Sequence, residues 1–351
     1  MNHFRIYSYI ITVPLLAIAL LILSTFLYMD PLIGDLTRIG GFTENNFGWN
    51  RKLEVFEEPL FKAAGGVRDY DKYYDVVVLG DSFSMQKQHS WINYFANESG
   101  LSTIAFHVDN VSVNKLVNSE IFKRLPPKFL IYESVERSLV ARHHNCSDDR
   151  NSSRLPARIP MYEFHSLNKS PVLLSRKQLA SRKKNTSISS AVNLAKKMAA
   201  RTISGKNKTA GLVTRLTTSE LFTNRSSNIL LYLDHDADKI NWSSSDKAKV
   251  RCFLVSQARA VEANRQTKFI AMIFPDKLSI YGPYIENEEL RDLLVIDEIN
   301  SAYYTQVRLD KIFSRAIGKG TRDVYLPNDT HCSDIGYKLA SRALIEMLRS
   351  N

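Results

Sequence analysis

Two short segments, far apart in the chain, carry residue types that can perform acyl transfer. The first, residues 80–84, reads Gly-Asp-Ser-Phe-Ser, and the second, residues 329–331, reads Asp-Thr-His. A serine hydroxyl attacks a carbonyl carbon when a histidine takes its proton and a carboxylate orients the imidazole. We therefore expect Ser82 to be the nucleophile, His331 the base and Asp329 the residue that orients it.

Each segment has a plainer explanation when taken alone. Gly-Asp-Ser is a common turn, and Asp-x-His at the start of a helix is explained by capping. Ser84 is the alternative nucleophile. The two segments point to catalysis only as a pair, because both are expected at the carboxyl edge of one parallel sheet, where ligands bind in open α/β folds.

Other residues near these segments are candidates for supporting the site. A developing oxyanion needs preorganised donors, and we expect one from the backbone N–H of Ser82. Asp81 and Asn110 are further candidates for the oxyanion hole or its support. Glu133 and Arg137 follow a predicted strand, and we expect them to form an ion pair that supports the site.

The elements that must position these residues alternate between strand and helix. Short apolar runs predict strands over 75–79, 103–108, 129–133, 268–274 and 323–326. Helices are predicted over 90–97, 113–125, 249–264 and most of 286–313, with a last helix that Ser333 caps. This alternation is typical of an α/β fold with a parallel sheet and helices on both faces.

The pattern is interrupted by a basic, Ser- and Asn-rich stretch over 142–228, with one helical segment over 188–201. Between residues 142 and 225 the chain has 17 Lys and Arg against 4 Asp and Glu, a surplus of +13, so this stretch accounts for the whole net charge of +11. We interpret it as an insertion or cap, flanked by the catalytic domain over 75–141 and 229–351. The charge distribution therefore does not favour a uniformly basic nucleic-acid binder. The chain also lacks the interleaved aromatic and basic residues of surfaces that bind single nucleic-acid strands.

The N-terminus predicts the compartment. Ile6–Met29 is a run of 24 residues without a charge, and a membrane-spanning helix needs about 20 apolar residues. Arg5 precedes the run and Asp30 follows it, which favours a cytoplasmic N-terminus. We expect a single-pass signal anchor over 1–30 in the inner (plasma) membrane, a juxtamembrane connector over 31–74 and a periplasmic catalytic domain. A cleaved signal peptide or a buried core helix would also explain the run.

The three cysteines are too few for a disulfide framework. Any one pair among Cys146, Cys252 and Cys332 could bridge in an oxidising compartment, and the sequence leaves the pairing open. His143 and His144 precede Cys146, but no second pair of ligands has metal-binding spacing. We expect neither a metal nor a cofactor.

The motifs together resemble the SGNH (GDSL-type) hydrolase superfamily, and in particular its alginate O-acetyltransferase-like branch. The resemblance is carried by residues 80–84, 132–139, 275–281 and 329–331 and covers roughly 70–140 and 229–350. It departs from that branch in the order of the two catalytic segments, in Cys332 where a Trp is usual, and in the Gly and Asn of the oxyanion hole, for which only Asn110 is a candidate. Lys277 and Tyr281 fit structural or rim positions.

The resemblance implies a flavodoxin-like sheet and a serine O-acetyltransferase that modifies cell-envelope or secreted polysaccharide through an acyl-serine. The acceptor would be a glycan, with acidic glycans suited to the basic insertion, and a membrane protein could supply the acyl group. A carbohydrate or lipid esterase with the same triad is the first alternative. The second is a catalytically degenerate domain that serves polysaccharide assembly.

Overall fold

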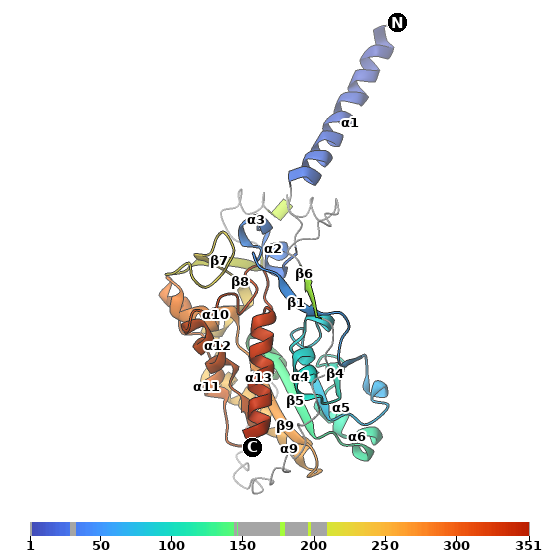
Figure 1. Ribbon diagram of the computed structural model, residues 1–351. Coiled ribbons are helices and arrows are strands. Elements are labelled where there is room, and N and C mark those ends of the chain that lie inside the picture. Colours follow the sequence, from blue (N-terminus) through green and yellow to red (C-terminus); the bar gives the residue numbers. More distant parts are fainter. Residues whose placement is uncertain are drawn as a thin grey trace.

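A six-stranded parallel sheet forms the centre of the protein (Figure 1). The computed structural model describes residues 2–28, 33–143, 146, 176–179, 196–197 and 209–350. The strand order is β10-β9-β5-β3-β4-β2, and every pairing is parallel. The strands are β2 (Lys62–Ala64), β3 (Val76–Gly80), β4 (Thr103–His107), β5 (Phe129–Val135), β9 (Lys268–Phe274) and β10 (Thr305–Val307). The predicted α/β class is therefore confirmed.

Helices cover both faces of the sheet because alternate strand residues point to opposite sides. Val76 and Val78 of β3 lie in one core with Trp91 and Tyr337, whereas Val77 of β3 lies in the other. The first core is covered by α4 (Trp91–Ser99), α12 (Leu309–Gly318) and α13 (Asp334–Ser350). The second is covered by α5 (Val113–Val117), α9 (Ser244–Glu262) and α11 (Ile296–Ile299). In Figure 1, α4 and α13 lie side by side in front of the sheet.

The strand order reverses at β3. After β3 the chain forms β4 on one side of it and then crosses to form β5 on the other. Ligands of open α/β sheets bind beyond the carboxyl ends of the strands at such a switch point. Ser82 follows the carboxyl end of β3 by two residues, so the fold places it at this position.

Several elements differ from the sequence prediction. The single helix predicted over 113–125 is two helices, α5 and α6 (Glu120–Arg124), because the Ser119 side chain caps a new helix by accepting from the Phe122 N–H. The long helix predicted over 286–313 is wrong, since α11, β10 and the start of α12 occupy it. The strand predicted over 323–326 is also wrong. Asp323 has a positive φ of 52° and only an isolated bridge joins Tyr325 to Cys332.

Residues before β3 contribute more than a linker. They form two short helices, α2 (Asp35–Gly40) and α3 (Glu44–Phe47), the strand β1 (Leu53–Phe56) and the edge strand β2 of the central sheet. Two antiparallel pairs complete the fold: β1 with β6 (Arg176–Leu179), and β7 (Gly211–Arg215) with β8 (Ile229–Leu233). Leu36, Phe42 and Phe47 pack with Leu231 of β8, which holds the short helices against the domain.

Part of the basic stretch forms strands that the sequence did not predict, β6 and β7. Of the helix predicted over 188–201, only Lys196 and Lys197 are described, and both are helical. Two further helices, α7 (Leu139–His143) and α10 (Lys277–Tyr281), follow β5 and β9.

The N-terminal helix α1 runs over Asn2–Tyr28. Among the described residues, no helix satisfies both the length and the apolarity that a membrane crossing requires. The structure thus gives no support to the predicted transmembrane anchor, which remains a prediction from the apolar run.

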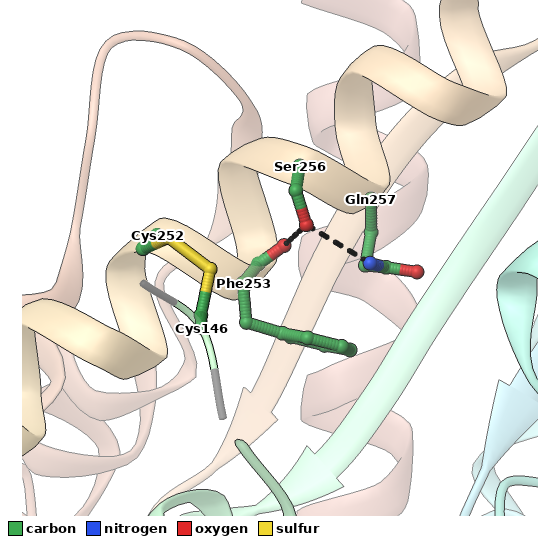
Figure 2. The surroundings of a disulfide bond; sticks show 5 residues. All are labelled: Cys146, Cys252, Phe253, Ser256 and Gln257. Atoms are coloured by element: carbon green, nitrogen blue, oxygen red, sulfur yellow. Dashed lines mark hydrogen bonds between the residues drawn. A yellow bond between two sulfur atoms is a disulfide. The ribbon is translucent and has the colours of Figure 1, made fainter. Parts of the chain in front are cut away.

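A disulfide joins Cys146, which follows α7, to Cys252 on α9 (Figure 2). Beside it, the ring of Phe253 stacks on His143, with ring centroids 3.6 Å apart. Cys332 is buried and carries a free thiol. The disulfide closes a loop of 106 residues and thereby ties the start of the basic stretch to the helix that follows it.

Candidate active site

The two predicted segments meet at the carboxyl edge of the sheet. The Ser82 hydroxyl donates to His331 Nε2 at 2.9 Å, and His331 Nδ1 donates to Asp329 Oδ1 at 2.7 Å. Ser82 is exposed, whereas His331 is buried. These distances suit a relay in which His331 takes the serine proton and Asp329 holds the imidazole in the required tautomer.

Asp329 is held in its ionised form. Burial raises the pKa of its carboxyl, but the hydrogen bond and charge of His331 and the backbone N–H groups of Asp35 and His331 outweigh burial and hold that pKa well below its usual range. The N–H of Asp35 donates to Oδ2 at 3.0 Å, and the N–H of His331 donates to Oδ1 at 3.0 Å. A carboxylate that stays charged can stabilise the imidazolium that forms when Ser82 loses its proton.

The turn after β3 leaves one backbone N–H for an oxyanion. The N–H of Asp81 donates to Glu133 Oε2 and that of Phe83 to Asp81 Oδ1, both at 3.0 Å. Among the described residues, the N–H of Ser82 has no hydrogen-bond acceptor. The Ser82 N–H is therefore the group in this turn that can bind a negative oxygen forming next to the serine.

Asp81 organises the turn. Its Oδ2 accepts from the Val135 N–H and from Arg142 Nη1, each at 2.9 Å. Burial raises the pKa of Asp81, but the Val135 N–H and the Arg142 charge lower it more, so the group stays ionised. Arg142 also donates to Ser134 Oγ at 2.8 Å. Arg142 was not predicted to be a site residue, because in the sequence it is the first of many basic residues in the insertion.

Glu133 lies beneath the turn and belongs to β5. It is fully buried, and its Oε2 also accepts from the Ser84 hydroxyl at 2.6 Å. Burial and the nearby charge of Asp81 raise its pKa well above the usual value, which favours the neutral acid. Ser84 is buried too and accepts from Trp91 Nε1 at 3.1 Å. The alternative nucleophile therefore points into this network and not toward the exposed edge where Ser82 lies.

The predicted ion pair between Glu133 and Arg137 is wrong. Arg137 Nη1 binds Asp276 at 2.8 Å and Asp236 at 3.3 Å instead, because it lies beyond the end of β5 and faces the start of α10. Its guanidinium lies 6.0 Å from the ring of Phe83, which packs against the His331 ring at 4.8 Å. Arg137 thus supports the site indirectly, through the Phe83 ring that packs against His331.

A buried lysine holds the loop that carries Asp329 and His331. Lys277 Nζ donates to the backbone carbonyls of Leu326 at 3.0 Å, Pro327 at 3.1 Å and Asp329 at 3.2 Å. Burial lowers the pKa of this ammonium to about 7, against the charge of Asp329, which raises it. Tyr281, the other residue of this motif, is buried.

Asn110 occupies an exposed turn after β4. Oδ1 of its neighbour Asp109 lies 3.8 Å from Nε of Arg142. Because Arg142 also binds Asp81, this turn lies at the same edge of the sheet as Asp81. Within the described part of the chain, no hydrogen bond joins the Asn110 side chain to Ser82. Its role in an oxyanion hole stays a prediction.

One group of residues has the spacing of a metal site. Ligand atoms of Asp35, Asp329 and His331 lie within 4.8 Å of one another. The hydrogen bond between Asp329 and His331 already accounts for their closeness, and the Asp35 carboxylate lies 3.7 Å from His331 Nδ1. The arrangement of the three residues matches a histidine that is oriented by a carboxylate.

Comparisons with known proteins give no match to a family model, to a curated protein or to a solved structure. The SGNH resemblance therefore rests on the short motifs themselves and remains a prediction.

Proposed function

We propose that the protein is a membrane-anchored O-acyltransferase that transfers an acyl group, expected to be acetyl, to hydroxyls of cell-envelope or secreted polysaccharide. The observation that carries this proposal is the chain of two hydrogen bonds from Ser82 through His331 to Asp329. A serine so placed can form a covalent acyl intermediate, which divides a difficult transfer into two easier steps.

In the first step, Ser82 Oγ attacks the donor's acyl carbonyl while His331 Nε2 takes the hydroxyl proton. The Ser82 N–H binds the oxygen that becomes negative. When the bond to the leaving group breaks, His331 returns the proton to that group, and the acyl group remains on Ser82. In the second step, an acceptor hydroxyl gives its proton to His331 and attacks the acyl carbon. The bond between that carbon and Ser82 Oγ then breaks, and His331 returns the proton to Ser82 Oγ.

The proposed acceptor class is supported by the charge of the basic insertion. One described lysine of the insertion contacts α2, the helix whose Asp35 N–H binds Asp329: Lys197 Nζ donates to the Arg38 carbonyl at 2.9 Å. The insertion also supplies β6, which pairs with β1. Positive charge concentrated near a site raises the local concentration of anionic substrate. An acidic glycan fits this arrangement.

The proposed location is extracytoplasmic, with the N-terminal helix in the inner membrane and the catalytic domain in the periplasm. The apolar run over 6–29 supports the anchor. The Cys146–Cys252 disulfide supports an oxidising compartment, since disulfides persist outside the cytosol. A membrane protein that delivers the acyl group would meet the enzyme there.

The test uses the full chain in detergent with p-nitrophenyl acetate as donor and an acidic oligosaccharide as acceptor. We expect acetylated oligosaccharide, an acetyl adduct on the peptide that contains Ser82, and loss of both in Ser82→Ala. The exposed Ser245 on α9 provides the matched control Ser245→Ala. Free acetate without acetylated sugar would point to the esterase, and equal turnover by Ser82→Ala would point to the non-catalytic alternative.

A further inference from the structure

The segment before the catalytic domain touches the catalytic loop, which we define as residues 326–331. The N–H of Asp35 donates to Asp329 Oδ2 at 3.0 Å. The carbonyl of Asn328 accepts from the N–H groups of Leu36 at 3.1 Å and Thr37 at 3.3 Å. Three consecutive N–H groups at the start of α2 therefore bind the catalytic loop, although almost 300 positions separate the two segments in the chain.

Gly34 makes this close approach possible. A Cβ atom added at Gly34 would lie 2.1 Å from the carbonyl oxygen of Asn328 and 2.6 Å from its carbonyl carbon. The backbone of Gly34 is extended, with φ −82°, so its torsion angles would suit any residue. Glycine is needed here for space, because any side chain would push α2 away from the loop.

Glu44 stabilises the same contact between the start of α2 and the catalytic loop. It is only 1% exposed, and its Oε1 accepts from the N–H of Ile33 at 2.8 Å and of Gly34 at 3.0 Å. Its Oε2 accepts from Asn328 Nδ2 at 2.7 Å. One buried carboxylate thus binds both the segment before α2 and the catalytic loop.

We propose that residues 33–44 are a positioning element of the active site: Gly34 and Glu44 seat α2 on the catalytic loop, and the Asp35 N–H holds Asp329 toward His331. With Oδ2 fixed by this N–H, Oδ1 is the oxygen left to accept from His331 Nδ1. The inference rests on the proposed function, since it assigns a role in the same reaction to residues outside the sequence motifs.

The first test compares two glycine variants of the full chain. In Gly34→Ala, kcat for p-nitrophenyl acetate should fall on the order of 10²-fold with little change in KM, because small displacements of catalytic groups have effects of that size. Gly66→Ala is the matched control, since an added Cβ there meets nothing within 4 Å and its φ of −165° is extended. Activity of Gly34→Ala within twofold of the wild type, or an equal loss in Gly66→Ala, would overturn the inference.

A second pair of variants separates positioning from general damage. Glu44→Ala removes the shared acceptor and should lower kcat about as much as Gly34→Ala. Glu44→Gln keeps one acceptor oxygen, and its amide can donate to the Asn328 side-chain oxygen, which has no hydrogen-bond partner among the described residues. Glu44→Gln should therefore recover most of the wild-type kcat, and loss as deep as in Glu44→Ala would count against the assigned role.

Amide hydrogen exchange distinguishes failure of this inference from failure of the proposed function. If the wild type neither turns over the ester nor acquires an acetyl group on Ser82, the proposed function fails. The positioning contact is still tested by the exchange rates of the backbone amides in residues 326–331. These amides should exchange faster in Gly34→Ala than in the wild type or in Gly66→Ala. Unchanged exchange in that segment would overturn the positioning role by itself.

Discussion

Lys277 holds the loop that carries Asp329 and His331 through three hydrogen bonds to its backbone. An ammonium has three N–H donors, and the loop offers it three carbonyls, those of Leu326, Pro327 and Asp329. Its pKa of about 7 means that the proton leaves as the pH rises through neutrality. The neutral amine has two N–H donors, so one carbonyl of the catalytic loop then loses its partner.

We therefore predict that loss of the Lys277 proton adds a downward step near pH 7 to the pH profile of ester turnover. In Lys277→Met, kcat should drop roughly tenfold or more, because the loop that carries Asp329 and His331 loses all three donors and small displacements of catalytic groups have large effects on rate. The pH profile of the activity that remains in Lys277→Met should lack the step near pH 7. The measurement is kcat from pH 5 to 9, with the exposed Lys319→Met as the control. An unchanged alkaline limb in Lys277→Met would contradict the prediction.

Among single residues, the sequence predicted those that belong to motifs. It did not predict those whose role depends on contacts made only in the folded protein. Ser82, His331 and Asp329 were named from residue type and their expected place at strand ends. Arg142 was hidden by the basic residues that follow it, and Glu44 stands in a stretch without periodic pattern. A buried partner cannot be recognised before the contact that buries it is known.

Among the elements, α9 joins the part of the chain before the insertion to the part after it. The Cys146–Cys252 bond attaches it to the chain beyond α7 (Figure 2). Tyr132 of β5 hydrogen-bonds to His143, the last residue of α7, at 2.8 Å. These contacts lie on the face of the sheet that α9 covers, whereas His331 packs against Phe83 of the other core.

Removing the disulfide should therefore affect stability more than catalysis. For the double variant Cys146→Ser with Cys252→Ser, we predict a loss of about 2–5 kcal/mol in the free energy of unfolding, as is usual for native disulfides that close long loops. Chemical denaturation measures this change, and kcat of the folded variant should stay close to the wild type. A large fall in kcat at temperatures where the variant is fully folded would show that α9 also shapes the site.

Strands buried on both faces were the elements easiest to predict. The run Lys-Phe-Ile-Ala-Met-Ile-Phe gave β9 with its bounds unchanged, because parallel strands inside a sheet read as continuous apolar runs. The edge strands β2 and β10 have three residues each and include Lys62 and Gln306, so their sequences show no such run. These short segments form strands because they pair with a neighbouring strand, and the local sequence pattern carries no information about that partner.

For the molecule as a whole, the charge is carried by a part that is not the catalytic domain. Outside residues 142–225 the chain has 30 basic and 32 acidic residues, which is nearly balanced. We propose that the insertion, apart from Arg142, which binds Asp81 in the turn that carries Ser82, selects the substrate by charge.

Neutralising lysines of the insertion should weaken activity on an acidic glycan and spare hydrolysis of a small neutral ester. For the fourfold change to Gln we expect KM for the glycan to rise about tenfold or more at low salt, with a smaller difference at high salt. The lysines are Lys183, Lys184, Lys196 and Lys197.

The control changes four exposed lysines of the catalytic domain to Gln: Lys115, Lys123, Lys311 and Lys319. It should leave both activities near the wild type. Equal losses on the glycan and the ester, or the same loss in the control, would remove the insertion from substrate selection.

The hydrogen bond between the Asp35 N–H and Asp329 also sets a working distance. The helix α1 ends at Tyr28, so seven residues lead from its end to Asp35, and seven fully extended residues span at most about 25 Å. If the surface that holds α1 lies at Tyr28, as the proposed anchor requires, Asp35 and the Asp329 that it binds stay within about that reach of it. A long polymer would then be acylated only where it passes close to that surface, so the spacing of acyl groups along it would record how the chain is drawn past the enzyme.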